Sequence, residues 1–160
     1  MLRFFVADWN LNGTLRYESG RPLNIFMSND LVGFLFNGQK RPDRVAGAKG
    51  VIDTSNFDPN AESYFNKSAW VDPGPLKFGN APRNDGTVRG FPTYNEDISI
   101  FKNFPIKERA KVRFEAQFGN IFNRVDFCYP NTNFSDSSFG QVNTQCNQPR
   151  SIQLGLRLDY

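Results

Sequence analysis

The sequence contains no histidine among its 160 residues. This absence removes the imidazole that most catalytic triads and general-base schemes require, and it also removes the commonest zinc ligand. Long hydrophobic runs are missing too, because no stretch approaches the roughly 20 apolar residues of a membrane-spanning helix. A helical membrane protein is therefore excluded, and we expect a protein that is not an enzyme and that uses neither a cofactor nor a metal.

Cysteine is scarce, since the chain has only Cys128 and Cys146, both within the polar stretch FCYPNTNFSDSSFGQVNTQC. Two free thiols are one interpretation. If the chain is exported, a disulfide that closes this stretch is the interpretation that we favour. In a loop-entropy model such a bridge stabilises the fold by about 3 kcal/mol.

Net charge is small, at +3, and the basic residues are scattered along the chain. We therefore expect no nucleic-acid partner. The opening residues, MLRFFVADW, do not form a secretory signal, because the apolar run is short, Asp8 interrupts it and no small-residue cleavage site follows.

Aromatic residues are abundant instead, with 17 Phe, 5 Tyr and 2 Trp. Apolar and polar residues alternate in WNLNGTLRY, EDISIFKNF, KVRFEAQFGNIF and RSIQLGLRLDY, and LRFFV is a partial fifth case. A period of two indicates strands with one face in apolar and the other in polar surroundings. The pattern predicts strands near residues 2–6, 9–17, 96–104, 111–122 and 151–160.

The connections between these strands are very unequal in length. Short links, Ala7–Asp8 and FPIKERA, alternate with long polar segments, residues 18–95 and 123–150. In an antiparallel meander, alternate connections fall at opposite ends of the sheet. One end then carries tight turns and the other long loops, which is typical of outer-membrane barrels with periplasmic turns and extracellular loops.

Such barrels direct apolar side chains to lipid and polar side chains to a wet lumen, with aromatic residues at both interfaces. Trp9 and Tyr17 bracket the first strand as interface residues would. The expected lipid-facing residues of the last strand are Ile152, Leu154, Leu156, Leu158 and Tyr160. The expected lumen-facing residues are Arg16, Arg113, Glu115, Gln117, Gln153 and Arg157.

A soluble alternative is a secreted β-sandwich that binds carbohydrate through exposed aromatic residues such as Tyr64, Trp70 and Phe78. A sandwich of this length should show about seven strands, with turns roughly every 8–12 residues. The four or five strands and the long irregular insertion are evidence against it.

Three further segments are candidate sites. Glu96 and Asp97 are adjacent on a strand, so their carboxylates should point to opposite faces and not converge on one substrate. The stretch DTSNFDPNAES offers oxygen ligands for calcium but lacks EF-hand spacing, which favours ordinary Asx turns. The basic segment GQKRPDRVAGAKG could contact anionic lipopolysaccharide or a substrate, although a solvated loop is the default.

Several stretches resemble, in order and spacing, the C-terminal part of TonB-dependent receptor barrels, specifically the Oar-like, carboxypeptidase-regulatory-like group. They are YESGRPLNI, KFGNAPRN with the following RGF, NEDISIFKNFPI, FEAQFGNIFNRVDF, FGQV and PRSIQLGLRLDY. The resemblance covers most of the chain beyond Asp8. Departures include Gln117, Gly119, the terminal Tyr160 and the cysteine pair.

The resemblance implies an all-β fold in which residues 1–160 form the C-terminal part of one outer-membrane barrel of about 22 strands, with a plugged lumen. We expect this chain to supply the last four or five strands and the outer loops, to contain no plug, and to begin inside a longer receptor. The implied function is nutrient uptake through the cell outer membrane of a Gram-negative bacterium, with the substrate-binding residues unknown.

The implied partners are outer-membrane lipid and lipopolysaccharide, the rest of the barrel with its plug, and the barrel-assembly machinery. TonB would act only indirectly, through the missing plug. Siderophore, glycan fragment and peptide all remain open as the substrate.

Overall fold

The computed structural model describes residues 6–28, 39–107 and 110–160. The chain divides into two compact units. The sheet unit consists of Met1–Glu18, Thr93–Asp126 and Cys146–Tyr160. The loop unit consists of Ser19–Pro92 and Phe127–Gln145.

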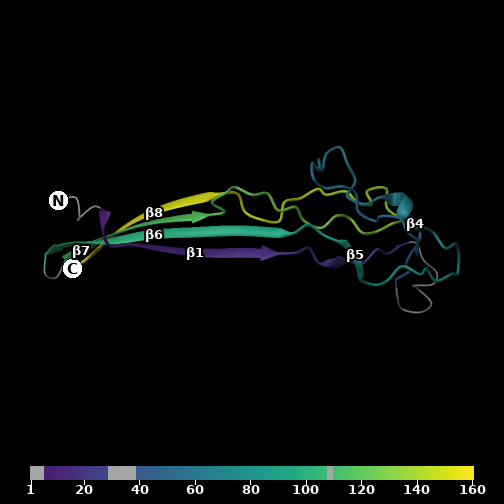
Figure 1. Ribbon diagram of the computed structural model, residues 1–160, viewed down its shortest axis with the longest axis horizontal. Coiled ribbons are helices and arrows are strands. Elements are labelled where there is room, and N and C mark those ends of the chain that lie inside the picture. Colours follow the sequence, from purple (N-terminus) through teal and green to yellow (C-terminus); the bar gives the residue numbers. More distant parts are fainter. Residues whose placement is uncertain (1–5, 29–38, 108–109) are drawn as a thin grey trace. The chain divides into compact units, whose positions relative to one another are not determined.

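The sheet unit contains a four-stranded antiparallel sheet in the order β1-β6-β7-β8 (Figure 1). Strands β6, β7 and β8 form a meander, and β1 pairs with β6 across the long insertion. The expected all-β, antiparallel architecture is confirmed. The strands are β1 (Trp9–Glu18), β6 (Thr93–Lys107), β7 (Ala110–Gly119) and β8 (Ser151–Asp159).

The strand ends differ from the sequence expectations at a few places. β1 and β8 end within one residue of the predicted ranges, whereas β6 begins three residues earlier and ends three residues later than residues 96–104. β7 stops at Gly119, short of the predicted residue 122. Most of the strand predicted near residues 2–6 lies outside the described residues, and Val6 belongs to no described strand.

β7 ends early because Asn120 adopts a left-handed backbone, with φ 47°. Asparagine tolerates this conformation better than most residues. Its backbone N–H donates to Asp97 Oδ1 at 2.9 Å, and its Nδ2 donates to the carbonyls of Arg124 (2.8 Å) and Gln148 (3.0 Å). Its Oδ1 accepts the Arg124 N–H at 2.8 Å. This one buried side chain therefore fastens the turn that follows β7.

The loop unit differs from the two irregular loops that the sequence suggests. It contains β2 (Pro22–Leu23) paired with β5 (Asp85–Arg89), β3 (Asp43–Arg44) paired with β4 (Trp70–Val71), and the short 3-10 helix η1 (Lys67–Ala69). Residues 18–95, expected to be one long irregular loop, contain these short strand pairs because the stretch holds enough aromatic side chains to form a core.

That core is centred on Phe65, which is 2% exposed. Its ring centroid lies 5.3 Å from that of Tyr64, 5.8 Å from that of Trp70 and 5.1 Å from that of Phe139. Phe139 comes from the stretch after β7 and the other rings from the stretch before β6, so two distant segments share one core. The buried cluster is Leu23, Ile25, Tyr64, Phe65, Ala69, Trp70, Ala81, Val88, Phe139 and Val142.

Gly140 holds these two segments together. It has φ +78°, and a Cβ there would collide with the Ser63 hydroxyl and press on the Phe65 backbone nitrogen. Its carbonyl accepts the Tyr64 N–H at 2.9 Å. The close approach of the two backbones therefore requires glycine at this position.

Candidate functional site

One face of the four-stranded sheet is apolar. Its register places Leu11, Ile100, Ala116 and Leu154 opposite one another across all four strands. The adjoining row is Gly13, Ile98, Phe118 and Ile152. Directly paired residues share a face, so these rows form a continuous surface, which we call the apolar face. Leu11 is 70% exposed there.

The residues of β8 that were expected to face lipid lie on this apolar face. Ile152, Leu154, Leu156 and Leu158 pair with apolar residues of β7, and each remains more than half exposed. Tyr160 follows the last residue of β8 and is also exposed. Such a large uncovered apolar surface marks a contact with a membrane or another apolar partner.

The six residues expected to face a lumen share the opposite face, which we call the polar face. Arg113 lies opposite Arg157, and Gln117 lies opposite Gln153. The register across β6 extends the same face to Arg16. An uncharged polar row of Asn12, Ser99, Gln117 and Gln153 lines a hollow of about 490 Å³.

Each arginine of the polar face has an acidic partner two residues further along its own strand. Arg16 Nε lies 2.7 Å from Glu18 Oε1, and Arg157 Nε lies 2.7 Å from Asp159 Oδ1. Arg113 Nε lies 3.6 Å from Glu115 Oε2. Exposed pairs of this kind add little stability, so their main consequence is a charge-balanced surface suited to water.

Aromatic pairs lie on the apolar face near both ends of β1. The Tyr17 and Tyr94 ring centroids are 5.7 Å apart at one end, and Trp9 meets Phe114 edge-on at 6.1 Å at the other. The distance from Trp9 to Tyr17 along β1 is about 27 Å at the usual rise per strand residue. This distance is comparable with the height of the apolar band of outer-membrane barrels. Sequence reasoning identified Trp9 and Tyr17 but not their partners.

Two charged residues also lie on the apolar face, and sequence reasoning missed one of them, Lys102. Lys102 pairs with Trp9 and Phe114 and is only 3% exposed. Its ammonium lies 5.5 Å from the Trp9 ring centroid and donates a 2.6 Å hydrogen bond to the Ala7 carbonyl. The period of two could have revealed it, because Lys102 follows Ile98 and Ile100 at even spacing.

Glu96 is the second such residue, and its side chain is completely buried. Arg124 Nε lies 3.0 Å from both carboxylate oxygens, and the guanidinium covers the Tyr94 ring at 5.6 Å. The hydrogen bond to Glu96 raises the pKa of Arg124 above its ordinary value. Glu96 pairs with Leu15 whereas Asp97 pairs with Thr14. The two carboxylates therefore lie on opposite faces, as expected.

In the loop unit, the basic segment 38–50 uses two of its cations internally, over its described residues 39–50. Lys40 is 5% exposed, and its Nζ donates to Asp72 Oδ1 and to the Gly74 carbonyl, both at 2.9 Å. The Lys40 hydrogen bond holds the pKa of Asp72 below its ordinary value. Lys40 is therefore part of the internal structure of this unit and not a solvated loop residue.

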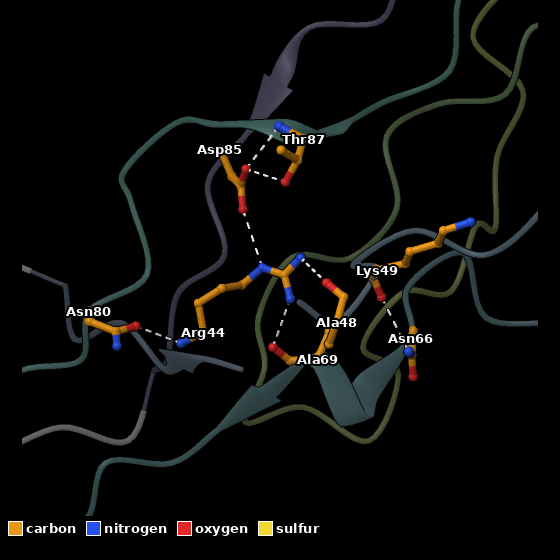
Figure 2. Close-up of polar contacts among 8 residues, drawn as sticks. All are labelled: Arg44, Ala48, Lys49, Asn66, Ala69, Asn80, Asp85 and Thr87. Atoms are coloured by element: carbon orange, nitrogen blue, oxygen red, sulfur yellow. Dashed lines mark hydrogen bonds and ion pairs between the residues drawn. The ribbon is translucent and has the colours of Figure 1, made fainter. Parts of the chain in front are cut away.

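Arg44 is the second internal cation (Figure 2). It donates to the carbonyls of Ala69 (3.0 Å) and Ala48 (2.7 Å), and its Nε lies 3.4 Å from Asp85 Oδ2. Asp85 Oδ1 accepts the Thr87 N–H at 2.8 Å and the Thr87 hydroxyl at 2.6 Å. Burial raises the pKa of Asp85, but the Thr87 hydrogen bonds and the Arg44 charge outweigh it and leave this pKa below its ordinary value.

The soluble carbohydrate-binding alternative needs exposed Tyr64, Trp70 and Phe78. The structure contradicts two of the three, because Tyr64 is 4% and Trp70 is 3% exposed within the core. Phe78 alone is exposed. Aromatic rings packed against other side chains present no free face to a sugar, so this set of residues cannot form the platform that was expected.

The calcium candidate, residues 53–63, forms Asx turns. Asp53 accepts from the Ser55 N–H at 3.0 Å and the Ser55 hydroxyl at 2.6 Å, and Asp58 accepts from the Asn60 N–H at 2.9 Å. Among the residues that the structure describes, no group of acidic or cysteine side chains is arranged to hold a metal ion. The Ser55 hydrogen bonds hold the pKa of Asp53 below its ordinary value.

The two cysteines, Cys128 and Cys146, are both disulfide-bonded in the structure. The sequence assigns no substrate-binding residues.

Within the described ranges, no helical segment has the length and hydrophobicity needed to cross a bilayer. Comparison with known proteins gives one match, to a family model. No curated protein and no solved structure matches the chain. The family model described as "Outer membrane beta barrel domain" matches residues 1–153. This match covers nearly the whole chain and agrees with a sheet that has one apolar and one polar face. The chain therefore belongs to the outer membrane beta barrel domain family.

Proposed function

We propose that this chain is part of a TonB-dependent receptor that imports a nutrient through the outer membrane of a Gram-negative bacterium. The observation that carries the proposal is the two-faced sheet, whose apolar face stays uncovered and whose polar face carries balanced charge. Facing lipid on one side and a water-filled lumen on the other satisfies both faces. The function is transport and not catalysis.

The sheet edges support membership of a larger barrel. Among the described residues, β1 pairs only with β6, and β8 pairs only with β7. In lipid, each unpaired backbone group costs several kcal/mol, and the smallest membrane barrels need about 8 strands. Further strands must therefore pair with β1 and β8, and in a receptor of this class they would bring the total to about 22.

The partners follow from this arrangement. The apolar face would contact lipid, the remaining strands would close the barrel, and the alternating pattern ending at Tyr160 would serve the barrel-assembly machinery. The loop unit would lie on the extracellular side, near lipopolysaccharide. TonB would act through a plug that other parts of the receptor supply.

The test is an uptake experiment in the source bacterium. Deleting the gene should slow growth on one scarce nutrient, and inactivating TonB should reproduce that defect without a further effect in the double mutant. Uptake that continues at the same rate without TonB would contradict the proposal. Recovery of the native protein from the culture medium as a detergent-free monomer would also contradict it.

A further inference from the structure

The loop unit contains a small pocket whose described lining residues all have polar side chains. Its volume is about 290 Å³, and its lining residues are Asn24, Gln39, Arg41 and Arg83. This is close to the lower end of ligand-pocket volumes. The pocket therefore suits a small ligand, and the lining suits a polar one.

Hydrogen bonds fasten the segments that form this pocket. The Pro42 carbonyl accepts the Ala81 N–H at 3.0 Å, and Asp43 Oδ1 accepts the Asn80 N–H at 2.9 Å. These bonds join the chain after Arg41 to the chain before Arg83. On the other side, the Lys40 carbonyl accepts the Met27 N–H at 2.9 Å, which holds the segment containing Asn24. The backbone around the pocket is thus preorganised.

The two arginines of the pocket differ from their neighbours in having no counter-charge. Lys40 is paired with Asp72 and Arg44 with Asp85. Neither Arg41 nor Arg83 makes a hydrogen bond or ion pair through its side chain to any described residue, and the described lining residues include no carboxylate. Guanidinium groups match the geometry of carboxylate and phosphate. The pocket therefore has the charge to attract an anion.

The lining also contains an unused acceptor. Asn24 Oδ1 is buried and has no hydrogen-bond donor, whereas Asn24 Nδ2 reaches Gln39 Oε1 at 3.4 Å. A buried acceptor without a donor is costly, and native structures seldom leave one unexplained. A ligand hydroxyl would supply the missing donor once the Asn24 amide turns this oxygen toward the pocket, whereas an anion without a hydroxyl, such as sulfate, would not.

We propose that this pocket binds a small soluble anion in which a phosphate or carboxylate is attached to a hydroxylated carbon skeleton. The anionic group contacts Arg41 and Arg83, and a hydroxyl donates to Asn24 Oδ1. If the loop unit is the extracellular part of a receptor, this class of compound is its cargo. Binding itself requires no transport, so a failure of the binding test leaves the transport proposal intact, and the reverse also holds.

The test is calorimetric titration of the full chain in detergent micelles with glycerol phosphate, gluconate, sulfate and uncharged glycerol. We expect saturable binding of glycerol phosphate or gluconate, weaker binding of sulfate and none of glycerol. Arg83→Gln and Arg41→Gln should each weaken binding by about tenfold or more. Asn24→Ala should reduce the preference for glycerol phosphate over sulfate.

Arg21→Gln is the matched control, because Arg21 is exposed in the same unit but does not line the pocket. It should leave binding unchanged. Arg83 is also exposed, so Arg83→Gln should fold normally, as thermal melts would verify, and it carries the test if Arg41→Gln does not fold.

Three results would overturn the proposal. The first is no saturable binding of either hydroxylated anion up to about 10 mM. The second is equal weakening by Arg21→Gln and Arg83→Gln. The third is Arg83-dependent binding of purified lipopolysaccharide when both small anions fail, which would assign the site to the membrane surface.

Discussion

Arg124 Nε lies at 3.0 Å from each carboxylate oxygen of Glu96, at the end of the apolar face that carries Tyr17 and Tyr94. The two partners differ in exposure, since the Glu96 side chain is 0% exposed and the Arg124 side chain is 43% exposed. Removing the Arg124 guanidinium leaves the buried Glu96 carboxylate without its counter-charge. Removing the Glu96 charge leaves an arginine side chain that water can still solvate.

We therefore expect Arg124→Gln to lower the free energy of unfolding more than Glu96→Gln does. Urea unfolding in micelles, followed by tryptophan fluorescence, measures both. Arg150→Gln is the control, because Arg150 is exposed and, among the described residues, its side chain makes no hydrogen bond, whereas its backbone N–H donates to Asn123 Oδ1. Equal losses for Arg124→Gln and Glu96→Gln would show that burial of Glu96 does not govern this contact.

Asn120 offers a second test in the same unit. Asn120→Ala removes three side-chain hydrogen bonds in a buried turn, and we expect it to cost about 2–3 kcal/mol. Asn123→Ala is a matched control, because Asn123 also has a positive φ, 52°, but is exposed and accepts only the Arg150 N–H. Strain from alanine is similar at both sites, so the difference in unfolding free energy reports the hydrogen bonds.

The acid stability of the loop unit should depend on Asp85. Its pKa in the folded state lies below its ordinary value of 3.8. The unfolded chain therefore takes up the proton first, and the stabilisation is present above pH 3.8 and is lost as the pH falls through the folded pKa. Asp85→Asn should be less stable than wild type at pH 6, and the two stabilities should converge near pH 2 in acid titrations. A gap that stays constant over this range would contradict the assignment.

The disulfide gives a prediction for oxidised and reduced protein. Mass spectrometry after alkylation should find Cys128 and Cys146 protected in protein purified without reductant. Cys128→Ser should lower the free energy of unfolding by about 3 kcal/mol. Dithiothreitol should lower the stability of wild type by a similar amount and leave Cys128→Ser unchanged. If reductant also destabilises Cys128→Ser, loss of the disulfide is not the cause of the destabilisation of wild type.

The period of two was sufficient to predict most of the sheet. It identified β1, β7 and β8 and separated Leu154 from Gln153 correctly, because alternation is a local property of a strand. The pattern missed Lys102, because this charge lies at an apolar position where the Trp9 ring and the Ala7 carbonyl stabilise the ammonium. That contact joins residues far apart in the sequence.

The loop unit was harder to predict for a related reason. Its core joins Phe65 and Trp70 to Phe139, and no sequence period marks such contacts. The sequence does not distinguish the cations of the basic segment from one another. In the structure, Lys40 and Arg44 form ion pairs with carboxylates of the same unit, whereas Arg41 does not. The pocket of Arg41 and Arg83 exists only because two distant backbone segments are hydrogen-bonded together, and this pairing leaves no signal in either segment alone.

The central claim is that the apolar face contacts lipid and the polar face contacts water. The most direct test compares Leu156→Arg with Gln153→Arg in the complete barrel, reconstituted in lipid and unfolded with guanidinium. Leu156 lies on the apolar face and Gln153 on the polar face, within the same strand. The account predicts a loss of about 2–4 kcal/mol for Leu156→Arg, if it lies near the bilayer midplane, and little loss for Gln153→Arg. Equal losses for the two variants would contradict the claim.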